Sequence, residues 1–149
     1  MSEPDSSAAG ARVAVRLGSD YMLRSLQMLG ELADGELLPA LISLAIVQAN
    51  VAHLEQEGGF RELDEPPQDE NRRPISILAI ANGLGLPYET TRRHVEKMIA
   101  AGQCARVRGG VIVPTAALTT PRHREFVLAN LANLRRLYRN LRRAGVSLD

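Results

Sequence analysis

Residues 74–114 constrain the fold more than any other part of this 149-residue chain, because their apolar spacing is helical at first and extended at the end. Ser76 can accept a hydrogen bond from a free backbone N–H at the start of a helix, which we expect from about residue 77 to residue 82. Gly83 and Gly85 follow, and glycine adopts positive φ angles without steric cost. The pattern therefore predicts a short helix that ends in a tight turn.

A second helix is expected after this turn, from about residue 87 to residue 101. It would begin at Pro87, where the missing proline N–H costs nothing, and end at Gly102. Side chains at i, i+4 and i+7 define one buried face, formed by Thr91, Val95 and Met98. The opposite face is polar and holds Tyr88, Glu89, Thr90, Arg92, Arg93, Glu96 and Lys97.

The residues after Gly102 change from helical to extended spacing. Residues 103–107 and 111–113 are expected to be short strands, joined at Arg108-Gly109-Gly110 by a tight hairpin turn of the Gly-Gly type. Arg106 and Arg108 would give this hairpin a basic tip.

Two helices joined by a glycine turn and followed at once by a hairpin resemble a winged helix-turn-helix. The resemblance implies that the second helix enters the DNA major groove and that the hairpin, or wing, rests near the sugar-phosphate backbone. Arg92 and Arg93 would be the leading contacts. The full set implied for DNA binding is Tyr88, Glu89, Thr90, Arg92, Arg93, Lys97, Arg106 and Arg108. Winged helices also serve as protein–protein adaptors that never touch DNA, and this alternative stays open.

Charge is distributed unevenly along the chain. Residues 1–70 contain four Arg and thirteen acids, a net of −9, whereas residues 71–149 contain thirteen Arg, one Lys and four acids, a net of +10. A basic half of this kind is expected of a phosphate-binding surface. With two Phe, three Tyr and no Trp, the chain lacks the aromatic platforms that single-stranded nucleic acids stack on, so double-stranded DNA is the expected partner.

The N-terminal part is expected to be a polar, disordered tail over residues 1–17, followed by helices within residues 18–57. Ser19 or Asp20 would cap a helix from about residue 21 to residue 32, and Ala33-Asp34-Gly35 would break it. The next helix, residues 36–56, is apolar on more than one face, so we expect two covering partners rather than a membrane span. Residues 58–73 are expected to form an acidic, solvated loop.

The C-terminal part, residues 115–149, is expected to contain one long helix. Thr120 and Pro121 predict its start and Gly145 its end. A heptad-like seam runs along it and predicts a homodimer through Val127, Leu131, Leu134, Tyr138 and Leu141. The alternative is packing within the chain against residues 36–56. The arginines of this helix would complement its dipole or pair with the acidic half across a subunit interface.

Helices on both sides of a winged core resemble small dimeric bacterial regulators of the MarR-like type. The short wing, the acidic insertion at residues 60–73 and Pro87 in place of a capping Ser or Thr depart from that pattern. The resemblance implies a mainly α fold with a small β-hairpin wing. It implies a transcriptional regulator and specifies no small-molecule effector.

No pattern in the sequence predicts an enzyme. His53, His94 and His123 are far apart and have no metal-ligand companion at helical spacing, so no catalytic residue, metal or cofactor is expected. The single cysteine, Cys104, fits a reducing cytosol, and we therefore expect a cytoplasmic protein.

Overall fold

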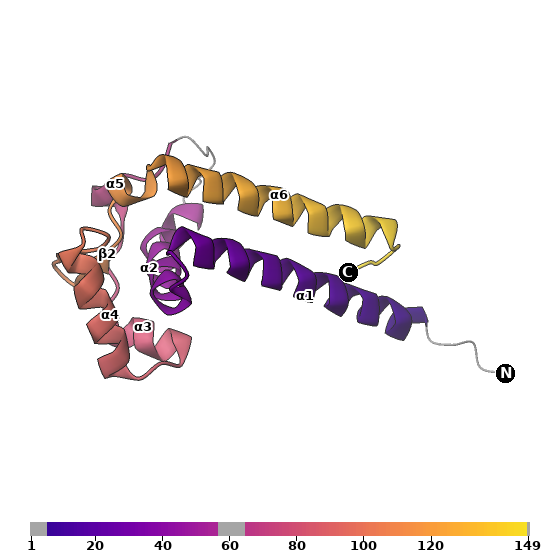
Figure 1. The fold of residues 1–149 in the computed structure, drawn as a ribbon, viewed down its shortest axis with the longest axis horizontal. Coiled ribbons are helices and arrows are strands. Elements are labelled where there is room, and N and C mark those ends of the chain that lie inside the picture. Colours follow the sequence, from indigo (N-terminus) through magenta and orange to yellow (C-terminus); the bar gives the residue numbers. More distant parts are fainter. Residues whose placement is uncertain (1–5, 57–64, 149) are drawn as a thin grey trace.

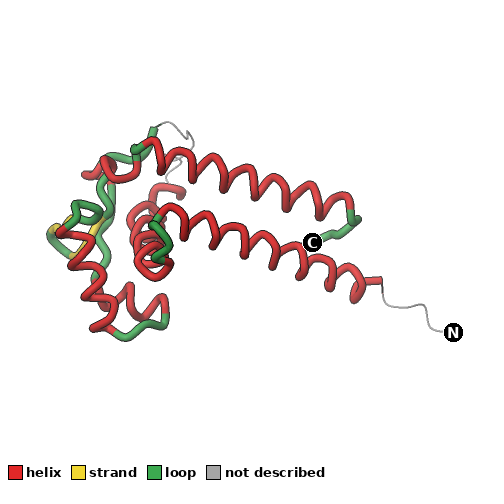
Figure 2. The backbone as a smooth tube through the Cα atoms, in the orientation of Figure 1, coloured by secondary structure: helices red, strands yellow, loops and turns green. Residues whose placement is uncertain are grey.

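The computed structural model describes residues 6–56 and 65–148, which form a mainly helical fold with one small antiparallel hairpin (Figure 1, Figure 2). This confirms the coarse fold class expected from the sequence. The elements in chain order are α1 (Ser6–Leu32), α2 (Leu37–Gln56), the short 3-10 helix η1 (Asp69–Asn71), α3 (Ile77–Leu84), α4 (Tyr88–Ala100), β1 (Ala105–Val107), β2 (Gly110–Ile112), α5 (Thr115–Leu118) and α6 (Pro121–Arg143).

The first helix is longer than the sequence pattern predicts. Because α1 begins at Ser6, the expectation of a disordered tail is wrong for residues 6–17, while residues 1–5 lie outside the described residues. Ser19 and Asp20 do not cap a helix, since both lie inside α1. Two causes act together: Leu17 is buried where α1 meets α6, and the residues before it are rich in alanine, the strongest helix former.

The ends of α6 agree with the sequence signals. The Thr120 hydroxyl accepts a hydrogen bond from the backbone N–H of His123 at 3.2 Å, and Pro121 occupies the first helical position. Ala144 ends the helix and Gly145 follows with φ 67°, a left-handed conformation that glycine adopts easily.

α6 runs antiparallel to α1, and the two helices project together from the rest of the molecule (Figure 1). Packing of α6 against residues 36–56, the alternative considered from the sequence, is wrong because its main partner is α1. Asn133 is buried in this contact and donates hydrogen bonds to the Tyr21 carbonyl and the Ser25 hydroxyl, each at 3.1 Å. These bonds fix the register of the two helices.

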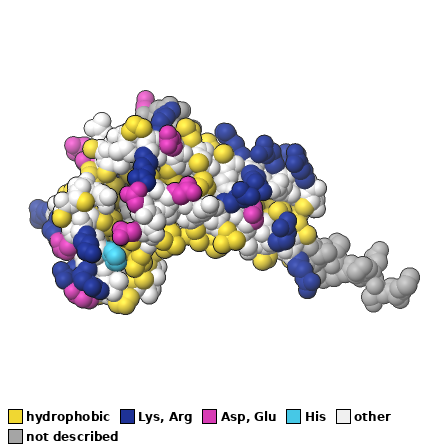
Figure 3. Space-filling view, in the orientation of Figure 1, with side chains coloured by type: hydrophobic (Ala, Val, Ile, Leu, Met, Phe, Trp, Pro, Cys, Tyr) yellow, Lys and Arg dark blue, Asp and Glu magenta, His cyan; other side chains and the backbone are white. Residues whose placement is uncertain are grey.

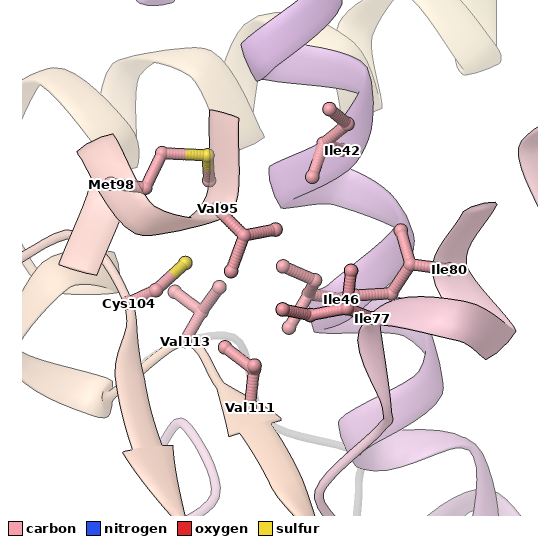
Figure 4. Packing of buried hydrophobic residues seen from close by; sticks show 9 residues of the cluster. All are labelled: Ile42, Ile46, Ile77, Ile80, Val95, Met98, Cys104, Val111 and Val113. Carbon is pink, nitrogen blue, oxygen red and sulfur yellow. The ribbon is translucent and has the colours of Figure 1, made fainter. Parts of the chain in front are cut away.

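The hydrophobic core is built around α2. Ile42 and Ile46 are fully buried and face α3, α4 and the hairpin (Figure 4). The other buried members of this cluster are Ile77, Ile80, Val95, Met98, Cys104, Val111 and Val113. Among the described helices α2 alone is long and apolar enough to cross a membrane by length and composition, and 28% of that stretch is buried within the fold.

The connection between α1 and α2 agrees with the predicted break. Asp34 and Gly35 have positive φ angles of 55° and 88°, which reverse the chain between the two helices. The Arg122 side chain of α6 also donates to the Glu31 carbonyl at 2.6 Å and to the Asp34 carboxylate at 2.7 Å. This connection is therefore held against the start of α6.

The acidic loop is more ordered than expected over residues 65–73. The Arg72 side chain is buried and donates to the Pro67 carbonyl at 3.0 Å. Thr115 joins the same cluster, because its backbone N–H donates to the Asp69 carboxylate at 2.7 Å. A fully solvated loop is thus wrong for this part, and residues 58–64 of the predicted loop lie outside the described residues.

Candidate nucleic-acid interface

The junction of α3 and α4 follows from local signals. The Ser76 hydroxyl accepts a hydrogen bond from the Ala79 N–H at 3.1 Å, which confirms the predicted cap. Gly85 ends α3 in the left-handed conformation with φ 66°. Gly83 does not make the turn, because α3 continues to Leu84. Pro87 occupies the N-cap position and provides no side-chain cap, so α4 begins at Tyr88, one residue later than expected.

The rotation of α4 about its axis is set by three buried side chains. Thr91 and Val95 are fully buried and Met98 is 4% exposed, so the predicted buried face is confirmed. The buried Thr91 hydroxyl donates to the Pro87 carbonyl at 3.0 Å, which satisfies the polar group. The opposite face of α4 must therefore point to solvent. Among its predicted site residues, Tyr88, Glu89, Arg93 and Lys97 are exposed, and Thr90 and Arg92 are half-buried.

Arg92 and Glu89 form an ion pair on the first turns of α4. The Arg92 guanidinium donates to both carboxylate oxygens of Glu89, at 3.1 and 2.5 Å. This hydrogen bonding lowers the pKa of Glu89 below its ordinary value and raises that of Arg92. Both groups remain ionised at neutral pH, and each neutralises much of the other's charge in the free protein.

A second ion pair joins the hairpin to α4. β1 and β2 pair in antiparallel register with Arg106 opposite Val111. β1 is shorter than expected from the sequence, and β2 has the expected length but begins one residue earlier. The Arg106 guanidinium contacts the Glu96 carboxylate on α4. This contact holds β1 beside the polar face of α4, and it engages one of the two arginines predicted to face phosphate.

The remaining cations of the predicted site are exposed. Arg93 and Lys97 lie one turn apart on α4, and Arg108 lies at the hairpin turn. None of the three forms an ion pair with a described residue. In Figure 3 the end of the molecule that contains α4 shows Lys and Arg side chains interspersed with acidic ones. The site is thus a mixed surface with three uncompensated cations.

The sequence pattern did not reveal two contributors to this arrangement. Glu96 was assigned only to the polar face of α4, whereas its carboxylate also forms an ion pair with Arg106 of β1. Asn50 of α2 is fully buried and receives a hydrogen bond from the Val113 N–H at 3.0 Å, directly after β2. Both contacts join separate elements, so no local spacing could signal them.

Other reactive groups do not gather near this surface. Cys104 is buried, and burial raises the pKa of its thiol to about 11, so the reactive thiolate is scarce at neutral pH. The described residues contain no group of three or more His, Cys, Asp or Glu placed to hold a metal ion. Comparison with protein-family models, curated proteins and solved structures gave no match.

Proposed function

We propose that this protein is a sequence-specific, DNA-binding transcriptional regulator that acts as a homodimer, with α3, α4 and the hairpin as a winged helix-turn-helix. One observation carries the proposal. The buried face formed by Thr91, Val95 and Met98 turns the polar face of α4 outward, beside a hairpin whose turn holds the exposed Arg108. A recognition helix requires this arrangement of one buried and one exposed polar face.

The first turns of α4 carry the groups that would read bases. With thirteen residues α4 is about 20 Å long. An α-helix with its side chains is about 10–12 Å in diameter, so it fits a major groove about 12 Å wide. Tyr88, Glu89 and Thr90 lie on its first turn, where recognition helices contact base edges. A glutamate carboxylate accepts a hydrogen bond from the amino group of cytosine, and an arginine donates two to guanine.

The ion pairs of the free protein are compatible with binding. An exposed i,i+3 pair contributes only about 0.3–0.5 kcal/mol, so separating Arg92 from Glu89 costs little compared with a phosphate or guanine contact. Separating the exposed Arg106 from Glu96 costs similarly little free energy, so Arg106 can turn to a phosphate. Arg93, Lys97 and Arg108 need no rearrangement, because they make no ion pair with a described residue.

A dimer would place two recognition helices on a palindromic site, about 34 Å or one DNA turn apart. The seam predicted on α6 supports this arrangement. Leu134 and Tyr138 are 49% and 61% exposed, although large apolar side chains gain free energy by leaving water. Val127, Leu131 and Leu141 are half-buried and continue the same row.

The test replaces the two leading contacts. The double variant Arg92→Ala/Arg93→Ala should bind a selected operator at least tenfold more weakly than the parent, since each lost contact to base or phosphate costs on the order of 1–3 kcal/mol. Fluorescence anisotropy at fixed salt measures the affinity. The matched control, Arg135→Ala/Arg142→Ala, removes two exposed arginines of α6 and should bind as the parent does. Equal affinity of the parent and the Arg92/Arg93 variant would refute the docking arrangement.

A protein–protein adaptor is the second candidate. It is favoured by the pairing of Arg92 with Glu89 and of Arg106 with Glu96, which leaves this surface less basic than the sequence suggests. Retention of the purified parent on random duplex DNA at low salt separates the two functions. A protein that is not retained would be an adaptor, and a retained one a DNA-binding protein.

A further inference from the structure

Arginines form rows along the two helices that project from the core. On α1, positions 12, 16, 20 and 24 are occupied by Arg12, Arg16, Asp20 and Arg24, and this four-residue spacing places them on one side of the helix. On α6, Arg136, Arg139 and Arg143 share one side by the same reasoning. Arg136 lies 3.7 Å from Asp20, so the two rows are neighbours. We call the six arginines of these rows the arginine face.

The arginine face is strongly basic. Six arginines and one acid, Asp20, give it a net charge of +5, and all six arginines are exposed. Asp20 is shared by Arg24 at 3.1 Å and Arg136 at 3.7 Å. The other four arginines form no ion pair with a described residue. Figure 3 shows Lys and Arg gathered over the far part of α1 and α6, on the same side of the molecule as those near α4.

The fold does not require this charge. A helix dipole favours cations only in the last turn, which accounts for Arg143 but not for Arg136 or Arg139. Arg12 and Arg16 belong to the N-terminal half of α1, where the dipole gives them no benefit. Leu17 and Asn133 are buried in the α1–α6 contact, and of the six arginines only Arg136 forms an ion pair across it with a described residue, Asp20. Like charges one turn apart repel each other, so Arg136, Arg139 and Arg143 destabilise α6 rather than support it.

Exposed apolar side chains lie on both sides of these helices. Leu23 of α1, three residues after Asp20, is on the side of the arginine row. Helical spacing places Val15 and Met22 of α1, and Leu134 and Tyr138 of α6, on the side of each helix away from its arginine row. A second copy that covered the side of Leu134 and Tyr138 would therefore leave the arginine face open.

We propose that the arginine face binds the phosphate backbone of duplex DNA, at phosphates separate from those that α4 and the hairpin contact. The inference rests on the proposed function, because both name duplex DNA as the ligand. Guanidinium groups bind phosphate oxygens through two parallel hydrogen bonds, which suits Arg better than Lys. Within a row the side chains are about 6 Å apart, so each arginine can reach a different phosphate.

The salt dependence of binding tests this directly, because each phosphate contact adds about 0.9 to the slope of log Kd against log salt concentration. The triple variant Arg136→Gln/Arg139→Gln/Arg143→Gln should lower the slope for a 30-base-pair duplex by about 2.7 and weaken binding on the order of a hundredfold at 0.1 M salt. The lysine triple at the same positions should keep most of the slope. The control Arg135→Gln/Arg142→Gln, which removes two exposed arginines of α6 that lie beside the row and outside the arginine face, should leave the slope within about 0.5 of the parent value.

The results that would contradict the inference can be distinguished from those that would contradict the proposed function. A parent that is not retained on duplex DNA would refute the proposed function and this inference together. A parent that binds, with an unchanged slope in the glutamine triple, would refute the inference alone. An equal loss per charge in the control would also refute it, because it would indicate the general field of the protein rather than contacts by this face. If the glutamine triple lost the parent's binding to phosphatidylserine vesicles or to polyglutamate and still bound DNA as the parent does, the face would be assigned to those partners instead.

Discussion

At the scale of single residues, Asn50 has a structural role that its position in an apolar stretch of sequence does not indicate. It lies in the middle of the apolar α2 with no exposed surface. Its side-chain amide donates to the carbonyls of Arg73 and Val111 at 2.7 and 3.2 Å, and its oxygen accepts from the Val113 N–H. The residue therefore joins the core helix to the segment that leads into α3 and to the strand that follows α4.

Replacing Asn50 with Leu keeps the number and branching of the side-chain heavy atoms and removes these bonds. The Val113 N–H and the Arg73 carbonyl would lose their side-chain partner, whereas the Val111 carbonyl still receives the Ile75 N–H at 3.1 Å. Two buried unsatisfied groups should lower the free energy of unfolding by about 2–4 kcal/mol. Urea denaturation measures the change. Gln48→Leu, at an exposed position of the same helix, should change stability by less than about 0.5 kcal/mol, and a similarly small loss for Asn50→Leu would contradict the role assigned to it.

Single-residue signals were sufficient where a backbone group is satisfied within one turn. Ser76 and Thr120 cap their helices, and Gly85 and Gly145 follow theirs, because each signal acts over three or four residues. Asn50 bonds to Val111 of β2, 61 residues away, and Arg72 to a threonine 43 residues away. Such contacts depend on the tertiary arrangement, so local spacing could not predict them.

At the scale of elements, the hairpin depends on a close approach of two backbones. Ile75 pairs with Val111 beside the hairpin, which adds a third extended segment to β1 and β2. A Cβ atom on Gly110 would lie 2.3 Å from the Ile75 carbonyl oxygen, and the Gly110 φ is 148°. Only glycine fits between the chain that enters α3 and the strand that follows α4.

Gly110→Ala should therefore destabilise the protein by about 2–4 kcal/mol, since backbone must move to relieve the overlap and the φ angle is unfavourable for alanine. Gly83→Ala is the matched control. Gly83 lies inside α3 with nothing within 4 Å of an added Cβ, so alanine should stabilise the fold by up to about 1 kcal/mol. Thermal and urea unfolding should rank the three proteins Gly83→Ala, parent, Gly110→Ala, and the reverse order for the two variants would be incompatible with this close approach.

Elements were predicted well where the pattern was local and poorly where it was not. The buried face of α4 and the ends of α6 followed from spacing and capping residues. The N-terminal half of α1 was missed because its short run of small side chains gives no clear apolar stripe, although its alanines favour a helix. The packing of α6 on α1, more than a hundred residues later in the chain, could not be read from local spacing.

At the scale of the whole molecule, the division of charge along the sequence is not a division in space. Arg12 and Arg16 come from the acidic half, yet they lie on the arginine face with Arg139 and Arg143 of the basic half. Arg136 pairs with Asp20 of the same chain, whereas pairing across a subunit interface was one expectation for this helix. The α1–α6 pair thus has one side rich in arginine and another with the exposed Leu134 and Tyr138, and each suits a different partner.

The apolar side leads to a prediction about assembly. The parent should sediment as a dimer at tens of micromolar, because a second copy would remove Leu134, Tyr138 and their neighbours from water. Leu134→Glu/Tyr138→Glu should give a monomer with a nearly unchanged melting temperature, since both side chains are exposed in the isolated chain. Leu78→Glu, at an exposed leucine of α3, should remain dimeric.

A monomeric parent at this concentration would refute the dimer. A variant that stays dimeric would move the interface away from α6. Loss of the dimer should also weaken binding to a palindromic operator more than binding to a half-site, because only the palindrome engages both recognition helices.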